Sequence, residues 1–327
     1  ETEIMDSEST HTDEFRYHDG RRYHNVKDAV YPLPNDEDEQ DRQHLQHFLM
    51  RYLWQSNFSA PINHILAKPG AKILDIGCGA GSWSFDMATT YPTSNVFGLD
   101  ISPHQPTQIE PENFKYVKAN VLEGIPFEDN IFDLVYQRFL SYAYTKDNWE
   151  YVMNEIVRVL KPGGFLEACL FLKFNLNLFI NILNNYINIF FKKMMEPSPH
   201  LFDAGPVTQR LMGVQSTLMT QRGVDLDLYQ NLEKLPQNQG QLENIEKEVK
   251  IIRHGVKSND IQLNKVGIDN LISIMAGMKS HTTRILQIFD DEFDEMLKAA
   301  EKELYESDFY YYLVRVYACK VVSDNNQ

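Results

Sequence analysis

Between residues 71 and 172, short apolar runs alternate with segments of helical periodicity, and this alternation constrains the fold more than any other feature. Five runs have the length and composition of buried strands: 71–77, 95–100, 114–120, 132–137 and 164–172. Helical patterns at 82–91 and 147–160 separate them. Strands that alternate with helices form parallel sheets covered on both faces. The sequence therefore predicts an α/β fold with a doubly wound, mostly parallel sheet.

Periodicity also predicts the elements outside this region. Helical spacing indicates four further helices: 37–55, 60–67, 261–279 and 291–306. Residues 248–254 and 309–322 are rich in β-formers, and the second run is expected to add an antiparallel strand. Residues 205–245 are rich in Gln and Asn and poorly periodic, so no regular element is predicted before about residue 242.

The N-terminal residues differ from the rest in composition. Residues 1–20 carry seven acidic side chains against one arginine, and we expect a solvated arm. Pro32 and Pro34 exclude a regular helix after this arm and favour an extended segment that packs on another part of the chain. Asn35 or Asp36 is expected to cap the helix that follows.

A stretch with two opposite faces follows the fifth predicted strand. Apolar residues form one helical face: Leu178, Phe179, Ile182, Leu183, Tyr186, Ile187 and Phe190. Asparagines form the other face: Asn181, Asn184, Asn185 and Asn188. A membrane span needs about 20 largely apolar residues, so the polar stripe argues against one. We expect an amphipathic helix that packs on the sheet or caps a pocket, with an oligomer contact or docking at a membrane surface as alternatives.

Charge and cysteine content narrow the classes of function. The chain of 327 residues has 31 Lys and Arg against 46 Asp and Glu, a formal charge of −15. Proteins that bind phosphate backbones carry basic patches, so nucleic acid is not expected as a partner. Three cysteines without CxxC spacing fit a reduced intracellular protein better than a disulfide scaffold or a zinc site. No signal peptide is visible, and we expect a cytoplasmic location, with the nucleus as the alternative.

The segment LDIGCGAG, which begins at residue 74, is the centre of the functional prediction. The first strand ends near Asp75, and Gly77, Gly79 and Gly81 follow with one residue between each. Glycines at this density let the backbone turn sharply and approach a ligand closely. The helix that follows presents its unpaired N–H groups at the same place.

A second position, Asp100, lies 23 residues after Gly77 at the end of the next predicted strand. A carboxylate there can accept hydrogen bonds from two ribose hydroxyls. The dinucleotide fingerprint GxGxxG would need a glycine at Ser82, whereas this chain has GxGxG with an acid two residues before the first glycine. This pattern resembles the class I S-adenosylmethionine (SAM) methyltransferases, in which the loop faces the amino-acid part of SAM.

Further segments extend the resemblance in the expected order. Asn120 and Val121 follow the third strand, where the family places a polar residue near the adenine amino group. Residues 126–138 and 160–167 resemble the family's fourth strand and its turn into the fifth. The resemblance implies a seven-stranded, Rossmann-like sheet of strand order 3-2-1-4-5-7-6, with an N-terminal arm and a helical cap.

A narrower resemblance begins upstream of the glycine-rich segment. Residues 21–47, 101–106 and 120–127 are similar to a fungal methyltransferase group that includes regulators of secondary metabolism. The similarity covers about 20–170 and the final strand, whereas 170–245 departs from it. Elements that face the substrate usually lie in such insertions, so the group does not predict the acceptor.

Two units are expected along the chain. Residues 1–36 form an acidic arm with a proline-containing segment, and residues 37–327 form the methyltransferase domain. Insertions at about 170–245 and 258–306 are expected to form a cap that closes one side of the substrate pocket.

The resemblance implies a SAM site made of eleven residues: Asp75, Gly77, Cys78, Gly79, Gly81, Asp100, Ile101, Asn120, Val121, Gln137 and Arg138. Four more are candidates for a lid or for acceptor contacts: Tyr23, Tyr31, Asn35 and Tyr142. Structural alternatives stay open, because Arg138 could instead form a salt bridge and the lid residues could simply pack on the sheet edge. Cys78 is expected to pack rather than to act as a nucleophile. The histidines show no metal-ligand spacing, so no metal is expected.

The predicted function is the transfer of a methyl group from SAM to a small molecule, with a protein acceptor less favoured. Such a transfer needs mainly proximity and alignment, so the sequence need not show a dedicated base, and no catalytic residue is assigned. A non-catalytic SAM-binding regulator that acts through a protein partner is one alternative, and a nicotinamide-dependent oxidoreductase is another. Oligomerisation through residues 178–190 is a further option.

Overall fold

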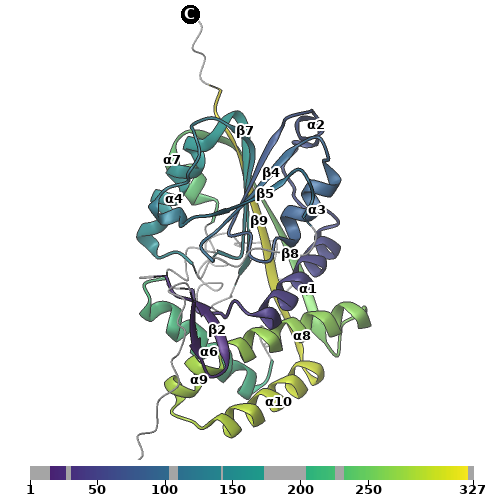
Figure 1. The fold of residues 1–327 in the computed structure, drawn as a ribbon. Coiled ribbons are helices and arrows are strands. Elements are labelled where there is room, and N and C mark those ends of the chain that lie inside the picture. Colours follow the sequence, from purple (N-terminus) through teal and green to yellow (C-terminus); the bar gives the residue numbers. More distant parts are fainter. Residues whose placement is uncertain are drawn as a thin grey trace, which may run out of the picture.

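The computed structural model describes residues 15–26, 31–102, 110–140, 143–172, 204–224 and 232–322. A seven-stranded sheet of order β5-β4-β3-β6-β7-β9-β8 runs through its centre (Figure 1). The strands are β3 (Lys72–Ile76), β4 (Asn95–Asp100), β5 (Phe114–Lys118), β6 (Phe132–Arg138), β7 (Leu160–Leu172), β8 (Leu242–Gly255) and β9 (Asp308–Lys320). β3 to β7 pair in parallel, and β9 lies antiparallel between β7 and β8. Counted along the chain, this is the order 3-2-1-4-5-7-6, so the predicted fold class is confirmed.

Helices cover both faces of the sheet and one of its ends. They are α1 (Glu37–Trp54), α2 (Asn63–Leu66), α3 (Ser82–Thr90), the 3-10 turn η1 (Val121–Glu123), α4 (Lys146–Val159), α6 (Pro206–Gln221), α7 (Lys234–Gln239), α8 (Ile261–Gly277), α9 (Lys279–Leu286) and α10 (Asp290–Glu306). In Figure 1, α4 and α7 flank one side of the sheet and α2 and α3 flank the other. α6, α8, α9 and α10 gather beyond one end of the sheet, and we call these four helices the cap.

Alternate side chains of β3 are buried on opposite faces, as expected for a central parallel strand. Leu74 packs in a cluster with Val152 and Ile156 of α4, and all three side chains are fully buried. Ile73 lies in the cluster of the opposite face, where the Trp83 ring of α3 stacks on Tyr136 at 3.9 Å between ring centroids. The near-continuous apolar strand pattern in the sequence is therefore explained by burial on both faces.

The two C-terminal strands are much longer than the central ones. β8 has 14 residues and β9 has 13, against 5 in β3. Near the cap, Ile252, Phe309 and Tyr311 of this pair pack with Ile268 of α8 and Leu304 of α10. The cap is therefore built on an extension of the same sheet.

The first turn of α1 shows which residue is the N-cap of this helix. Asp36 Oδ1 accepts a hydrogen bond from the Glu39 amide at 3.2 Å, and the Asp36 carboxylate also pairs with the Arg21 guanidinium. Asn35 instead donates from its side chain to Ser102 Oγ at 3.1 Å. Asp36 is therefore the N-cap residue of α1, and Asn35 links the N-terminal segment to the end of β4.

Three local expectations are corrected. Residues 15–20, at the end of the predicted arm, are largely exposed but belong to an antiparallel hairpin of β1 (Phe15–His18) and β2 (Arg21–His24). Asp19 and Gly20 both have positive φ, the two-residue turn that an Asp-Gly pair favours, and this signal was missed. α6 begins at Pro206 within the stretch where no regular element was predicted. The helix predicted over 261–279 ends at Gly277, and α9 starts after Met278.

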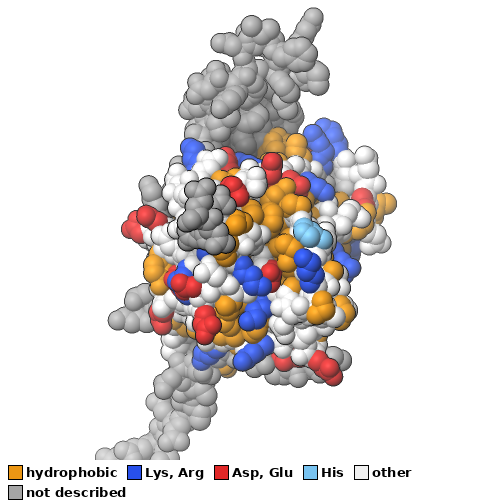
Figure 2. All heavy atoms as spheres, turned by 90° about the horizontal axis from the view of Figure 1, so that it is seen from above, with side chains coloured by type: hydrophobic (Ala, Val, Ile, Leu, Met, Phe, Trp, Pro, Cys, Tyr) orange, Lys and Arg blue, Asp and Glu red, His pale blue; other side chains and the backbone are white. Residues whose placement is uncertain are grey.

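Some predicted elements lie outside the described residues. These are residues 1–14, the 178–190 stretch and Tyr142. In the described part of the chain, no helix is both long enough and apolar enough to cross a membrane. Figure 2 shows the molecule from above, where acidic and basic side chains are interspersed with apolar ones.

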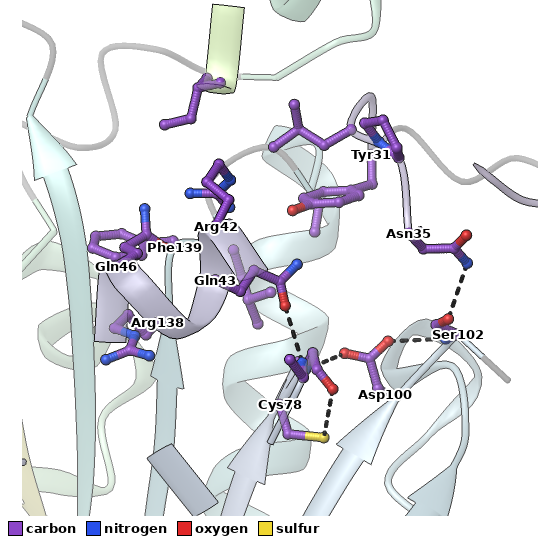
Figure 3. Close-up of a pocket in the computed structure, with 18 of the residues that line it drawn as sticks. Tyr31, Asn35, Arg42, Gln43, Gln46, Cys78, Asp100, Ser102, Arg138 and Phe139 are labelled. Atoms are coloured by element: carbon purple, nitrogen blue, oxygen red, sulfur yellow. Dashed lines mark hydrogen bonds between the residues drawn. The ribbon is translucent and has the colours of Figure 1, made fainter. Parts of the chain in front are cut away.

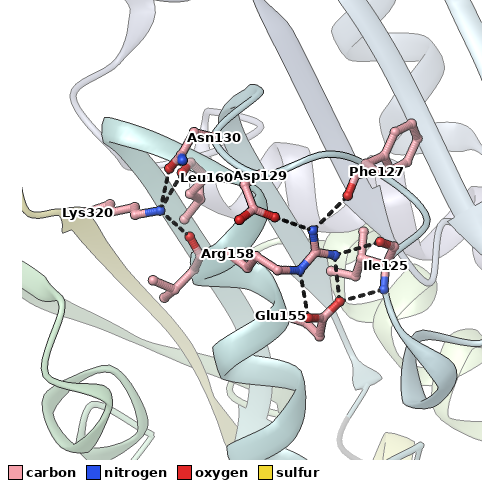
Figure 4. A network of polar contacts seen from close by, with 9 residues as sticks. Ile125, Phe127, Asp129, Asn130, Glu155, Arg158, Leu160 and Lys320 are labelled. Carbon is pink, nitrogen blue, oxygen red and sulfur yellow. Dashed lines mark hydrogen bonds and ion pairs between the residues drawn. The ribbon is translucent and has the colours of Figure 1, made fainter.

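Arg158 of α4 organises the loop that precedes β6 (Figure 4). Its guanidinium donates to the carbonyls of Ile125 and Phe127 at 2.7 and 2.8 Å and to the carboxylate of Glu155 at 2.7–2.8 Å. It also pairs with Asp129. Several acceptors at fixed positions match the planar fork of arginine better than the point charge of lysine.

We expect Arg158→Met to lower the free energy of unfolding by about 2 kcal/mol, because two backbone carbonyls and a carboxylate lose their donor. Arg158→Lys should restore less than half of this loss. Urea denaturation of both variants checks the prediction, with Lys298→Met in the exposed Lys298–Glu295 pair as a control that should change little. Full rescue by lysine would show that charge alone matters here.

Candidate functional site

A cavity of about 500 Å³ lies at the carboxyl ends of β3, β4 and β6, between the sheet and the cap. This is the edge where open α/β sheets bind ligands. Its volume falls within the range of small-molecule sites, ~300–1,000 Å³. The sheet side is lined by the loops after these strands, and the opposite side by α1, α6 and α8.

The glycine-rich loop forms one wall of the cavity. Gly77 and Gly79 have φ of +67° and +52°, which side chains rarely adopt. A Cβ atom at Gly77 would overlap the Leu140 side chain, and one at Gly79 would overlap Gln43 Oε1. The glycines therefore allow both the turn and the close approach of these side chains to the backbone.

Asp100 meets this loop from the neighbouring strand (Figure 3). Its Oδ2 accepts from the Gly79 amide at 2.8 Å, and its Oδ1 accepts from the Ser102 amide at 2.9 Å. Burial raises the pKa of Asp100, and the amide hydrogen bonds oppose that rise by stabilising the carboxylate. The glycine-rich loop and Asp100, which the sequence analysis identified, thus contact each other at the cavity wall.

Asp75, at the end of β3, is buried beneath the loop. Its Oδ2 accepts a hydrogen bond from Ser84 Oγ at 2.7 Å. Burial raises the pKa of Asp75 to about 7, with opposing contributions from the Ser84 hydrogen bond and the nearby Arg138, and the charge of Asp100 adds to the rise. Asp75 therefore braces the first turn of α3 and lines the cavity as well.

Arg138 lines the cavity at the end of β6 without an ion-pair partner among the described residues. Its Nη1 lies 3.4 Å from His47 Nδ1, and its guanidinium lies 5.7 Å from the centre of the Phe139 ring. Burial lowers the pKa of His47 despite its hydrogen bond to Asp86, so this imidazole is neutral near pH 7 and its Nδ1 can accept from Arg138. The positive charge of Arg138 is thus available to an anionic ligand group.

Six more predicted residues line the cavity: Cys78, Ile101, Asn120, Val121, Tyr31 and Asn35. The Asn120 side chain caps η1 by accepting from the Leu122 amide at 3.1 Å. Burial raises the pKa of the Cys78 thiol well above its ordinary value, which agrees with a packing role.

Three predicted residues do not line the cavity. Gly81 caps α3 instead. Gln137 points to the face covered by α4 and α7, because successive residues of a strand alternate, and it contacts a separate small cavity lined by Met153 and Pro236. Tyr23 is buried on β2 beneath the guanidinium of Arg16.

The polar face of α1 was missed in the sequence. Gln40, Arg42, Gln43 and Gln46 all line the cavity. Figure 3 shows Gln43 pointing to the glycine-rich loop, where its Oε1 accepts from the Ala80 amide at 3.0 Å. Glutamines three residues apart were the available signal, but only the apolar spacing of this helix was considered. Among the described residues, no group of three or more His, Cys, Asp or Glu side chains could hold a metal ion.

Comparison with known families agrees with this geometry. Residues 73–164, from β3 into the first half of β7, match a family model described as a methyltransferase domain. This segment is therefore similar to methyltransferase domains. It contains the glycine-rich loop, Asp100 and Arg138, and the observed strand order is the one expected of the class I methyltransferase fold.

Curated relatives share about half of the chain. It is 34% identical over 157 residues to the secondary metabolism regulator laeA of Aspergillus niger, covering 47% of this chain and 40% of the relative. It is 35% identical over 161 residues to the methyltransferase pytC of Aspergillus terreus, covering 49% and 47%. The chain thus spans less than half the length of the curated relatives it matches.

Solved structures give a more distant likeness. A putative methyltransferase from Bacillus halodurans matches with a TM-score of 0.44 and 16% identity, over 80% of this chain and 98% of that one. The fold of the present chain is defined by its own strand order.

The raised pKa of Asp75 predicts a pH-dependent contribution to stability. The folded state holds the proton up to about pH 7 and the unfolded state only to about pH 4, so this contribution is complete below pH 4 and is lost as the pH rises through 7. Asp75→Asn does not titrate and can still accept from Ser84. Relative to wild type, its free energy of unfolding should therefore rise by about 2–3 kcal/mol between pH 5 and pH 8.

Urea denaturation at the two pH values measures this difference. Asp291→Asn, at an exposed position of α10, is the matched control and should follow wild type at both. A constant difference between Asp75→Asn and wild type would contradict the burial argument.

Proposed function

We propose that the chain is a SAM-dependent methyltransferase that acts on a small molecule. The observation that carries the proposal is the contact between Asp100 and the Gly79 amide at the wall of a ligand-sized cavity, within a segment similar to methyltransferase domains. This contact places a carboxylate beside a loop that only glycine can form, at the sheet edge where ligands bind.

The residues present fit SAM. Gly77 and Gly79 bring backbone to the cavity wall, and an amino-acid group would lie against it once the ends of the Leu140 and Gln43 side chains move aside. Arg138, with no ion pair in the described structure, would hold the carboxylate of that group. Asp100 has the lone pairs to accept from both ribose hydroxyls, and Asn120 and Val121 flank the position expected for adenine. When bound, SAM supplies a methyl group activated by the positive sulfur.

The cap supplies an apolar wall opposite these polar groups. Its lining side chains are largely aliphatic or thioether: Leu211, Met212, Leu271, Ile274, Met275 and Met278. An apolar surface excludes water and favours an uncharged acceptor of small-molecule size. The surplus of acidic over basic residues supports the same class, because nucleic acid would be repelled. The chain's part in methyl transfer is then to align the acceptor and to keep water out.

The alternative is a non-catalytic SAM-binding protein that regulates through a protein partner. The printed name of the Aspergillus niger relative, a secondary metabolism regulator, favours it, whereas pytC of Aspergillus terreus is named a methyltransferase. Incubating the protein with methyl-labelled SAM and a small-molecule extract separates the two. Label in extract components supports the enzyme, and SAM binding without any transfer supports the regulator.

Calorimetric titration tests the cofactor directly. Wild type should bind SAM and S-adenosylhomocysteine but not NAD. Asp100→Asn should weaken S-adenosylhomocysteine about 10–100-fold, because a charged hydrogen-bond acceptor contributes ~1.5–3 kcal/mol. The side-chain oxygen of asparagine can still accept from the Gly79 amide, although the acceptor of the Ser102 amide is lost, so thermal unfolding of the variant is measured alongside.

Glu128→Gln is the matched control for that variant, because it removes the charge of an exposed carboxylate that does not line the cavity. Its affinity for S-adenosylhomocysteine should stay close to that of wild type. Binding of NAD alone, or unchanged affinity in Asp100→Asn, would overturn the assignment of the cofactor site.

A further inference from the structure

A continuous chain of hydrogen bonds runs from the glycine-rich loop through α1 to the cap. The Ala80 amide donates to Gln43 Oε1 at 3.0 Å, and Gln43 Nε2 donates to Glu39 Oε1 at 3.1 Å. Arg42 donates to both Glu39 oxygens at 2.6 and 2.7 Å. Its Nη1 also donates to Asn270 Oδ1 of α8 at 2.9 Å. We call these four side chains, Gln43, Glu39, Arg42 and Asn270, the α1 link.

Burial makes the inner members of the link costly to separate. Glu39 is 2% exposed, Arg42 6% and Asn270 1%. An ion removed from water must keep its partner, because an unpaired buried charge is strongly destabilising. The paired geometry of Arg42 and Glu39 also fixes the direction in which the guanidinium meets Asn270. Because these three side chains are buried, water does not readily replace the hydrogen bonds between them.

Gln43 and Arg42 of the link line the cavity, and Asn270 lies directly behind the cavity wall. Ala80 follows Gly79, at the end where SAM is proposed to bind, and the Gln43 side chain reaches the loop from α1 (Figure 3). Asn270 precedes Leu271, and α8 also supplies Ile274 to the apolar wall. The link therefore joins the cofactor end of the cavity to the acceptor end.

We propose that the α1 link is a positioning device that couples the cap wall to the glycine-rich loop. It rests on the proposed function, because the ligand of the loop is taken to be SAM. The link holds α8 in a fixed position relative to the glycine-rich loop. A ligand or substitution at the α8 wall therefore alters binding at the loop, and the reverse also holds. Asn270 is then a positioning residue for a ligand that it does not touch.

Two substitutions at one position test the link. Asn270→Leu removes the acceptor of Arg42 at similar volume, and Asn270→Asp retains it. We expect Asn270→Leu to weaken the affinity for S-adenosylhomocysteine by about fivefold or more, and Asn270→Asp to stay close to wild type. Asp269→Ala, at the neighbouring α8 residue that pairs with exposed Lys265, is the control and should bind as wild type does.

A double-mutant cycle shows whether the effect passes through α1. In a Gln43→Ala background, Asn270→Leu should cause little additional loss of affinity, because the connection to the loop is already broken. Thermal unfolding of each variant is followed in parallel, since a purely structural role would lower stability without this non-additivity. If Asn270→Leu does not fold, the cycle is run with Asn270→Ala, which also lacks an acceptor for Arg42.

The outcomes separate this inference from the proposed function. If wild type does not bind S-adenosylhomocysteine, the proposed function fails, and the inference fails with it. If wild type binds and Asn270→Leu binds equally well, or if the losses from Gln43→Ala and Asn270→Leu simply add, the α1 link alone is overturned.

Discussion

The hydrogen bond from the Gly79 amide to Asp100 joins two neighbouring strands at the point where both end. On one side of it, the left-handed backbone of the glycines brings the loop close enough for contact. On the other, the Ser102 amide and the Asn35 side chain hold the end of β4 against the N-terminal segment. The cavity owes its shape to this junction, because α1, β4 and the start of α3 all meet there.

Most of the sheet could be predicted from the sequence. Apolar runs buried on both faces, such as that of Ile73 and Leu74, leave little choice but a central parallel strand. The carboxyl-edge position of Asp100 follows from the same topology. Side-chain direction at strand ends was less predictable, since a one-residue step turns Gln137 to the α4 face and Arg138 to the cavity.

The missed features have two different physical causes. Arg42 is buried and Gln43 half-buried because α1 lies against the loop and α8, and the hydrophobic pattern of a single helix does not reveal such partners. The β1–β2 hairpin has few apolar residues, so its acidic surroundings outweighed the Asp19-Gly20 turn signal. Tertiary contacts thus explain the polar residues of α1, whereas the hairpin follows a local turn preference.

The long pairing of β8 with β9 has a mechanical consequence. From Glu246 onward the pairing register of β8 with β9 is uninterrupted as far as His254 and Phe309, near the helices α8 and α10. A swing of the helical layer as a separate rigid body would have to bend this ladder. Sheet and helical layer should therefore melt together in one cooperative transition, and ligand entry should involve smaller shifts of individual side chains and turns.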